Sequence, residues 1–370
     1  MNGTLLGAAL AAFTLALFVS AMAMPAAASL GGRFGMTVSP RLFGRAEHSV
    51  SYLGGVALAL GVVPAIVILA GIDERVAAIL AGALALLVFG LADDRVPGPG
   101  LHPAFRLVIE TLVAYLVWAS GLRPVLTGRP VADALLVIFC LVAATNALNL
   151  LDNMDGVAGC TGAGLAVGLL AVAIIEGQYL LAVLAAAVTG SCLSFLRHNL
   201  SDARLYLGNG GSLFLGFVVA ASALQLDLPF GTPWGFVGLL VVLAIPAMDT
   251  SVVILSRLFA GRPVFQGGVD HLSHRLVRLG LTTRAAALTH GAGCALAAMG
   301  VLLSLELEKA LPLVVVLAIF GGCGLAILRL AMYEAAPEQL PMLPEGGGPW
   351  DAVELAPPYA PVRARGGSES

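Results

Sequence analysis

Long apolar runs constrain the fold of this chain more than any other feature of its sequence. The runs reach the roughly 17 to 25 residues that a helix rising 1.5 Å per residue needs to cross about 30 Å of hydrocarbon. Hydrophobic residues make up 59% of the 370 residues and charged residues only 11%, whereas about 25% of the residues in soluble domains are charged. We therefore expect an all-α, polytopic integral membrane protein.

Polar breaks divide the chain into about eleven expected transmembrane helices. They lie near residues 4–24, 53–71, 76–92, 105–120, 133–149, 157–176, 178–196, 211–228, 234–256, 284–304 and 310–332. Residues 335–370 are rich in Pro, Gly and Ser and lack apolar periodicity, which is typical of disorder. We expect a transmembrane domain over residues 1–334 and a disordered cytoplasmic tail over residues 335–370.

Basic residues are distributed unequally between the two sets of loops that join these helices. With the N-terminus outside, only Arg75, Arg123, Arg129 and Lys309 fall on the outer side, and the rest of the 19 Lys and Arg residues fall inside. Cytoplasmic loops carry such an excess of positive charge. We therefore expect an outer N-terminus and a cytoplasmic C-terminus.

An aspartate pair follows the third expected helix on its inner side. Asp93 and Asp94 are adjacent, so their carboxylates repel one another unless a cation lies between or beside them. Carboxylate oxygens suit Mg²⁺ or Mn²⁺. The alternative interpretation is an ordinary loop start that is solvated by the cytoplasm.

A second polar run follows the fifth expected helix and repeats every three residues, which on a helical turn would place its members along one face. Its members are Asn146, Asn149, Asp152 and Asp155. Membrane proteins rarely place four such groups at the end of a span without a ligand for them. A series of helix caps and turn formers, ended by Gly156, would give the same pattern.

Two further inner segments would suit a phosphate. Residues 208–212, Gly-Asn-Gly-Gly-Ser, resemble a loop that lets a phosphate approach the backbone at a helix N-terminus. The loop after the ninth expected helix carries basic and imidazole side chains that would bind phosphate oxygens or would only reflect the positive charge inside. Asp249 lies near the inner end of that helix, where a charge is costly. Together these parts predict a phosphoryl-transfer site with a lipidic substrate.

These segments resemble the polyprenyl-phosphate N-acetylhexosamine-1-phosphate transferase family over nearly the whole chain except the tail. The aspartate pair and residues 101–106 are similar to the family's aspartate pair and the basic segment that follows it. Residues 146–156 match most closely. Residues 208–216 resemble the family's Gly-Asp-x-Gly-Ser-Leu-x-Leu-Gly loop, and residues 270–274 resemble its His-rich loop.

The resemblance implies transfer of a sugar-1-phosphate from a UDP-sugar, a UDP-N-acetylhexosamine, to undecaprenyl phosphate with release of UMP. Such a reaction is a first membrane step of cell-wall or surface-glycan synthesis. The resemblance also implies a multi-pass protein of the bacterial inner membrane with its active site facing the cytoplasm. Membrane lipid would be a partner, nucleic acid would not, and a homodimer is compatible with the family.

The resemblance further implies roles for individual residues. Asp93, Asp94, Asp152 and Asp155 would be catalytic. Asp94, Asp152 and Asn209 would hold Mg²⁺ or Mn²⁺. The substrates would be bound by Asn146, Asn149, His48, Arg106, Arg262, His271, His274, Arg275, Gly208 and Ser212.

Two departures from the family pattern keep other functions open. The first inner loop retains His48 but lacks the family's Pro-x-Pro-Arg, and Asn209 stands where the family has an aspartate. One alternative is therefore a catalytically altered or inactive paralogue that binds the lipid carrier. A membrane permease that uses Glu110 and Asp249 as ion sites is another. Turnover of a UDP-sugar by the purified protein separates these alternatives.

The charge distribution generates a topological prediction. In a background without native cysteines, Arg95→Cys, Asn153→Cys, Ala203→Cys and Gly268→Cys should react only with reagents that reach the cytoplasm, and Leu126→Cys only with reagents from outside. Labelling of Asn153→Cys from outside the cell would contradict the predicted orientation.

Overall fold

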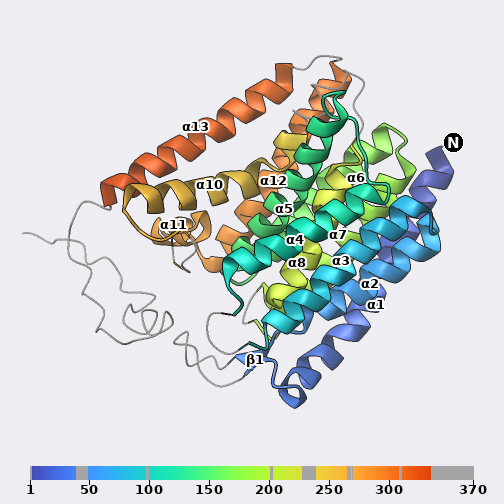
Figure 1. The fold of residues 1–370 in the computed structure, drawn as a ribbon, viewed down its shortest axis with the longest axis horizontal. Helices are drawn as coiled ribbons and strands as arrows, with labels where there is room; N and C mark the ends of the chain where they lie inside the picture. Colours follow the sequence, from blue (N-terminus) through green and yellow to red (C-terminus); the bar gives the residue numbers. More distant parts are fainter. Residues whose placement is uncertain are drawn as a thin grey trace, which may run out of the picture.

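The computed structural model describes residues 2–38, 49–96, 100–200, 203–226, 239–264, 268, 270–307 and 311–334. Within this part of the chain the helices lie side by side in a bundle, with the N-terminus and the short β1 segment toward opposite ends (Figure 1). His48 and the expected tail, residues 335–370, lie outside the described residues.

The helices follow the expected spans in order. The first eight are α1 (Asn2–Arg33), α2 (Gly54–Ala70), α3 (Glu74–Asp93), α4 (Pro103–Ala119), α5 (Pro130–Leu151), α6 (Val157–Ile175), α7 (Tyr179–Asn199) and α8 (Gly208–Ala223). They are followed by α10 (Ala244–Phe259), α11 (Leu272–Arg278), α12 (Thr283–Glu306) and α13 (Leu311–Glu334). Between α1 and α2, strands β1 (Thr37–Val38) and β2 (Val50–Ser51) pair antiparallel, with Thr37 opposite Ser51. The short helix α11 was not expected in the basic loop.

The length and composition of the helices confirm an all-α membrane protein. Six of them, α1, α3, α5, α6, α7 and α12, are long and apolar enough to cross a bilayer, and α2, α8 and residues 314–329 of α13 are shorter apolar helices. Large apolar side chains such as Phe18, Leu135 and Phe139 are about two thirds exposed, as expected where lipid rather than water covers a helix. The predicted number of eleven spans and their orientation stay predictions.

Helix α8 lies at the centre of the bundle. All of its residues are buried except Asn209, which is partly exposed, and it packs against α2, α3, α5, α6 and α7. Glycines allow the closest of these contacts. A Cβ atom on Gly55 of α2 would lie 2.0 Å from Cα of Gly211, and a Cβ atom on Gly90 of α3 would lie 2.5 Å from Cα of Gly210. The backbones of three helices therefore meet with no side chain between them.

The topological prediction places the loop between α4 and α5 on the outer side and uses Leu126→Cys as its probe. Leu126 is buried, so a cysteine at this position would be poorly accessible from either side of the membrane. Val125 in the same loop is 62% exposed, and Val125→Cys is the better probe for this side.

The glycine contact at α8 generates a prediction about stability. Gly90→Ala should destabilise the folded protein by about 1 to 3 kcal/mol, because the added methyl group meets backbone that cannot move aside. Gly7→Ala in α1 is the matched control, since nothing lies within 4 Å of its added Cβ and alanine favours a helix. Thermal melting in detergent would measure both, and equal melting temperatures for the two variants would contradict the packing described for Gly90.

Candidate active site

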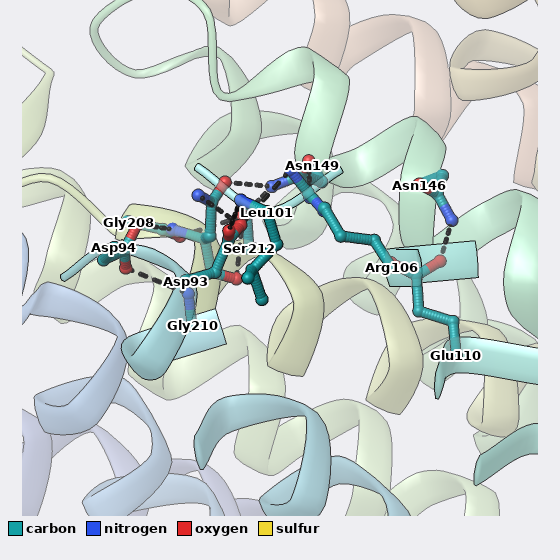
Figure 2. A network of polar contacts seen from close by, with 11 residues as sticks. Asp93, Asp94, Leu101, Arg106, Glu110, Asn146, Asn149, Gly208, Gly210 and Ser212 are labelled. Atoms are coloured by element: carbon teal, nitrogen blue, oxygen red, sulfur yellow. Dashed lines mark hydrogen bonds and ion pairs between the residues drawn. The ribbon is translucent and has the colours of Figure 1, made fainter. Parts of the chain in front are cut away.

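Four helix ends meet on one side of the bundle and bring together side chains that are far apart in the sequence. Figure 2 shows this network. Asp93 and Asp94 come from the C-terminal end of α3, Arg106 from the start of α4, Asn149 from the end of α5 and Asn209 from the start of α8. The proximity expected for these segments is confirmed, while the roles of the individual residues stay predictions.

The carboxylate of Asp94 satisfies the N-terminus of α8. Its Oδ1 accepts a hydrogen bond from the backbone N–H of Asn209 at 3.0 Å, and its Oδ2 accepts one from Gly210 at 3.3 Å. Gly208 has a φ of 70°, and a Cβ atom on it would lie 2.7 Å from Asp94 Oδ2. The N–H groups that the glycine segment was expected to offer to a phosphate therefore donate to Asp94 in this structure.

Asp93 is buried and joins three other segments. Its Oδ1 accepts a hydrogen bond from the backbone N–H of Leu101 at 2.6 Å, and its Oδ2 accepts one from Nδ2 of Asn209 at 3.0 Å. Nη1 of Arg106 lies 3.4 Å from the same Oδ2. Because both oxygens already have partners, the main effect of Asp93 is to fix the chain after α3 against α4 and α8.

Asn149 is the junction between α4, α5 and α8. Its Nδ2 donates to Oδ1 of Asn209 at 3.1 Å and to Oγ of Ser212 at 2.7 Å, and its Oδ1 accepts from Nη2 of Arg106 at 2.9 Å. Asn209 thus uses both ends of its carboxamide, on Asp93 and on Asn149. A metal ion bound by Asn209 would compete with these contacts.

Asn146 points away from this network, toward α4. Its Nδ2 donates to Oε2 of Glu110 and, at 2.9 Å, to the carbonyl of Val142. Glu110 is 1% exposed, and its Oε1 has no hydrogen-bond partner among the described residues. The buried Glu110 and the partly buried Asn146 form a polar pair beside Arg106 (Figure 2).

The expected helical repeat from Asn146 to Asp155 is wrong in its second half. Helix α5 ends at Leu151, so Asp152 and Asp155 lie in the turn that precedes α6. The turn is fixed at Gly156, whose φ is 81° and whose N–H donates to Oδ1 of Asn199 at 2.7 Å. Gly156 is the left-handed N-cap of α6, and the acids are presented by the turn before it rather than by one helical face.

Burial dominates the electrostatics of Asp94 and Asp152. Burial raises the pKa of Asp94 to about 6 against the hydrogen bonds from α8, and burial together with the charges of Asp94 and Asp155 raises the pKa of Asp152 to about 7. Burial is the main cause that raises the pKa of Tyr52 to about 12, and the negative charges of Asp94 and Asp152 contribute to the same shift. Its phenol is therefore a neutral donor at neutral pH.

This environment fits a divalent cation at Asp94 and Asp152. Carboxylates with acidic neighbours are stabilised by a nearby cation, and none of the hydrogen bonds found among the described residues involves the carboxylate of Asp152. In the same part of the chain, no three His, Cys, Asp or Glu side chains converge as a complete protein-only metal site. A cation at this position would therefore take part of its coordination from water or substrate.

The expected basic loop forms a second polar cluster around α11. Oδ2 of the buried Asp249 lies 2.8 Å from Nδ1 of His271, and Nε of Arg257 donates to Oδ2 of Asp270 at 2.8 Å. Burial alone would raise the pKa of Asp270, but Arg257 outweighs it and lowers that pKa. Arg262 is exposed.

Two residues of α11 differ in what they offer a phosphate. Burial, reinforced by electrostatic contributions from His271 and Arg278, lowers the pKa of His274 to about 4. His274 is therefore neutral at neutral pH and would be a hydrogen-bonding group rather than a cation. Arg275 keeps its charge and donates from Nε to the carbonyl of Asp270 at 2.9 Å.

A hydrogen bond joins the two clusters. Oγ of Ser273, in α11, donates to Oδ1 of Asn153, in the turn that carries Asp152, at 2.8 Å. The sequence-based predictions included neither this pair nor the position of Tyr52 near the acids. Asn153 lies inside a recognised motif, and Ser273 lies between two histidines, but nothing in the sequence indicates that the two residues touch.

Comparison with known proteins identifies the family of this chain. Residues 76–227, which contain Asp93, Asp94, Arg106, Asn149 and Asn209, match the model of glycosyl transferase family 4. A Streptomyces coelicolor protein named provisionally as a glycosyltransferase is 39% identical over 268 residues, covering 69% of this chain and 61% of the relative. The chain therefore spans somewhat less than two thirds of that relative's length.

Two further relatives have more specific names. A Bacillus subtilis protein named as a probable undecaprenyl-phosphate N-acetylglucosaminyl 1-phosphate transferase is 32% identical over 251 residues, covering 64% of this chain and 68% of the relative. A decaprenyl-phosphate N-acetylglucosaminephosphotransferase of Mycolicibacterium smegmatis is 27% identical, covering 69% of this chain and 72% of the relative. The chain belongs to glycosyl transferase family 4 and, within it, to the polyprenyl-phosphate hexosamine-1-phosphate transferases.

Proposed function

We propose that the protein transfers a sugar-1-phosphate from a UDP-N-acetylhexosamine to undecaprenyl phosphate and releases UMP. An oxygen of the lipid phosphate attacks the phosphorus that bears the sugar, the bond from that phosphorus to the bridging oxygen breaks, and UMP leaves with that oxygen. The observation that carries the proposal is the convergence of Asp94, Arg106, Asn149 and Asn209 where four helix ends meet. The names of the Bacillus and Mycolicibacterium relatives support the substrate class.

A groove beside Arg106 supports a lipid acceptor. It has a volume of about 500 Å³ and lies between α4 and α5, lined by Leu107, Val108, Thr111, Leu112, Tyr115 and Ile138. Its lining is almost wholly apolar, so a hydrocarbon chain suits it better than a nucleotide or a sugar does. Arg106 precedes the groove directly in the sequence and would hold the phosphate of a lipid whose chain lies along α4.

The acids and the α11 cluster would bind the donor. Asp94 and Asp152 would hold Mg²⁺ or Mn²⁺, which neutralises charge on the diphosphate. His271, His274, Arg275 and Arg262 would contact phosphate or sugar, and Tyr52 would donate a hydrogen bond. Neutralisation and orientation of the reacting phosphates by such groups account for most of the catalysis in phosphoryl transfer.

The same proposal places the protein in the bacterial inner membrane with this site facing the cytoplasm, where UDP-sugars are available. The excess of basic residues on one side of the predicted topology supports this orientation. Undecaprenyl phosphate and membrane lipid are the proposed partners, and a homodimer stays a prediction. Release of UMP from a panel of UDP-sugars, by purified protein with undecaprenyl phosphate and Mg²⁺, tests the function directly. No release from any donor would favour the inactive paralogue.

Neutralising either proposed metal ligand should impair turnover. Asp94→Asn and Asp152→Asn should each reduce the rate of UMP release by on the order of 10² or more, because each removes charge beside the cation. Asp73→Asn is the control: this aspartate caps the other end of α3, about 30 Å from Asp93, where it accepts from the N–H of Val76, and asparagine caps helices as well. Near-normal turnover in Asp94→Asn and Asp152→Asn would refute the assignment.

Restoring the family's aspartate at position 209 should couple stability to divalent cations. In Asn209→Asp the donor to Asp93 Oδ2 is lost and two carboxylates face one another, so without a cation the variant should melt several degrees below the wild type. Addition of Mg²⁺ should raise its melting temperature more than that of the wild type. Ca²⁺ and a monovalent salt at equal ionic strength are the controls. Identical Mg²⁺ responses in variant and wild type would show that position 209 lies outside the reach of the cation.

A further inference from the structure

Asp249 is a buried acid that the proposed reaction has not yet used. It lies in α10 with no measurable exposure, and both of its oxygens contact the start of α11. Its Oδ2 lies 2.8 Å from Nδ1 of His271, and its Oδ1 accepts the backbone N–H of Leu272 at 2.6 Å. A fully buried carboxylate is costly unless its oxygens accept hydrogen bonds, so this pair of contacts requires a reason.

We propose that Asp249 is a positioning residue for His271, which it holds by the proton on Nδ1 so that Nε2 is the ring atom that meets the substrate. The inference rests on the proposed function, because it assigns His271 to the phosphates or sugar of the donor. Asp249 itself touches neither substrate and acts through the imidazole.

The hydrogen-bonding chemistry of the two residues fixes the direction of the contact. A carboxylate only accepts hydrogen bonds, and a backbone N–H only donates. Oδ1 accepts from Leu272, so Oδ2 must accept a hydrogen bond that the Nδ1–H group of His271 donates. No hydrogen bond found among the described residues uses Nε2 of His271. The hydrogen bond from Ser273 to Asn153 then holds the same turn of chain against the segment that carries Asp152, and so brings the ring to the proposed donor site.

A purely structural role would explain less of this geometry. If Asp249 only capped α11, the contact with Leu272 would suffice and the histidine would be interchangeable. A helix cap contributes only modestly to stability, and this contribution is small against the cost of burying a carboxylate away from water. Removal of a hydrogen-bond partner that orients a functional histidine in this way typically lowers activity by about 10- to 100-fold.

Asp249→Asn tests the proposal because a carboxamide has only one accepting oxygen. With that oxygen on Leu272, the NH₂ group faces Nδ1, which must then become an acceptor. At a pH where the ring is neutral, the proton should move to Nε2. Nitrogen-15 NMR of histidine-labelled protein in detergent distinguishes the two tautomers, and His271→Gln assigns the signal. The rate constant kcat should fall about 10- to 100-fold, with a smaller change in KM for the UDP-sugar.

Asp133→Asn is the matched control. Asp133 is also buried and also accepts two hydrogen bonds, from the N–H of Thr127 at 2.6 Å and from its Oγ at 2.7 Å, but it lies at the opposite end of α5 from Asn149. This variant should keep the wild-type tautomer of His271 and the wild-type kcat. A loss of fold caused merely by replacing a buried aspartate would affect both variants alike.

The wild-type spectrum decides the proposal even where Asp249→Asn fails to fold. His271 protonated on Nε2 alone in the neutral wild-type ring would overturn it, as would a folded Asp249→Asn that retains both the Nδ1 proton and full kcat. If the wild type releases no UMP from any donor, the proposed function fails, while the tautomer of His271 still reports whether Asp249 holds the ring.

Discussion

The organisation of the site depends on how the N-terminus of α8 is satisfied. This helix is surrounded by other helices, so water cannot reach most of its backbone, and its first N–H groups need protein acceptors. Leu207, at the N-cap position, supplies no side-chain acceptor. Asp94 supplies both oxygens from the end of another helix, and its negative charge lies at the positive end of the α8 dipole. The packing of the central helix and the placement of a candidate active-site acid therefore depend on the same two hydrogen bonds.

The neutral residue at position 209 follows from the same arrangement. Its carboxamide donates to Asp93 and accepts from Asn149, which an aspartate could not do, because a carboxylate has no donor. The side chain thus links two neighbours that an aspartate would connect only through a cation. In this chain the network is complete without added charge at position 209, and burial still raises the pKa of Asp94 and of Asp152.

The positions of the helices could be predicted from the sequence better than the contacts between them. Apolar runs located the helices, and the motifs predicted that Asp94, Arg106, Asn149 and Asn209 would meet. The glycine segment was interpreted as a phosphate loop, because composition alone does not distinguish a backbone that approaches a ligand from one that approaches another helix. The pairs Asn146–Glu110, His271–Asp249 and Ser273–Asn153 were missed for a related reason: each joins separate elements, and one sequence does not state which helices are neighbours.

The glycine contacts between α2, α3 and α8 separate the scaffold of the site from its chemistry. Gly55, Gly90, Gly210 and Gly211 place backbone directly against backbone, so no rotamer change in this contact can alter the distance from Asp94 to α8. Side chains on the α5–α6 turn and on α11 lie outside this rigid unit. Substitutions there can change charge, tautomer or ligand preference while the acid and the helix end that it caps keep their positions. The ligand specificity of the site can therefore change through these side chains without loss of the glycine contacts that pack α2, α3 and α8.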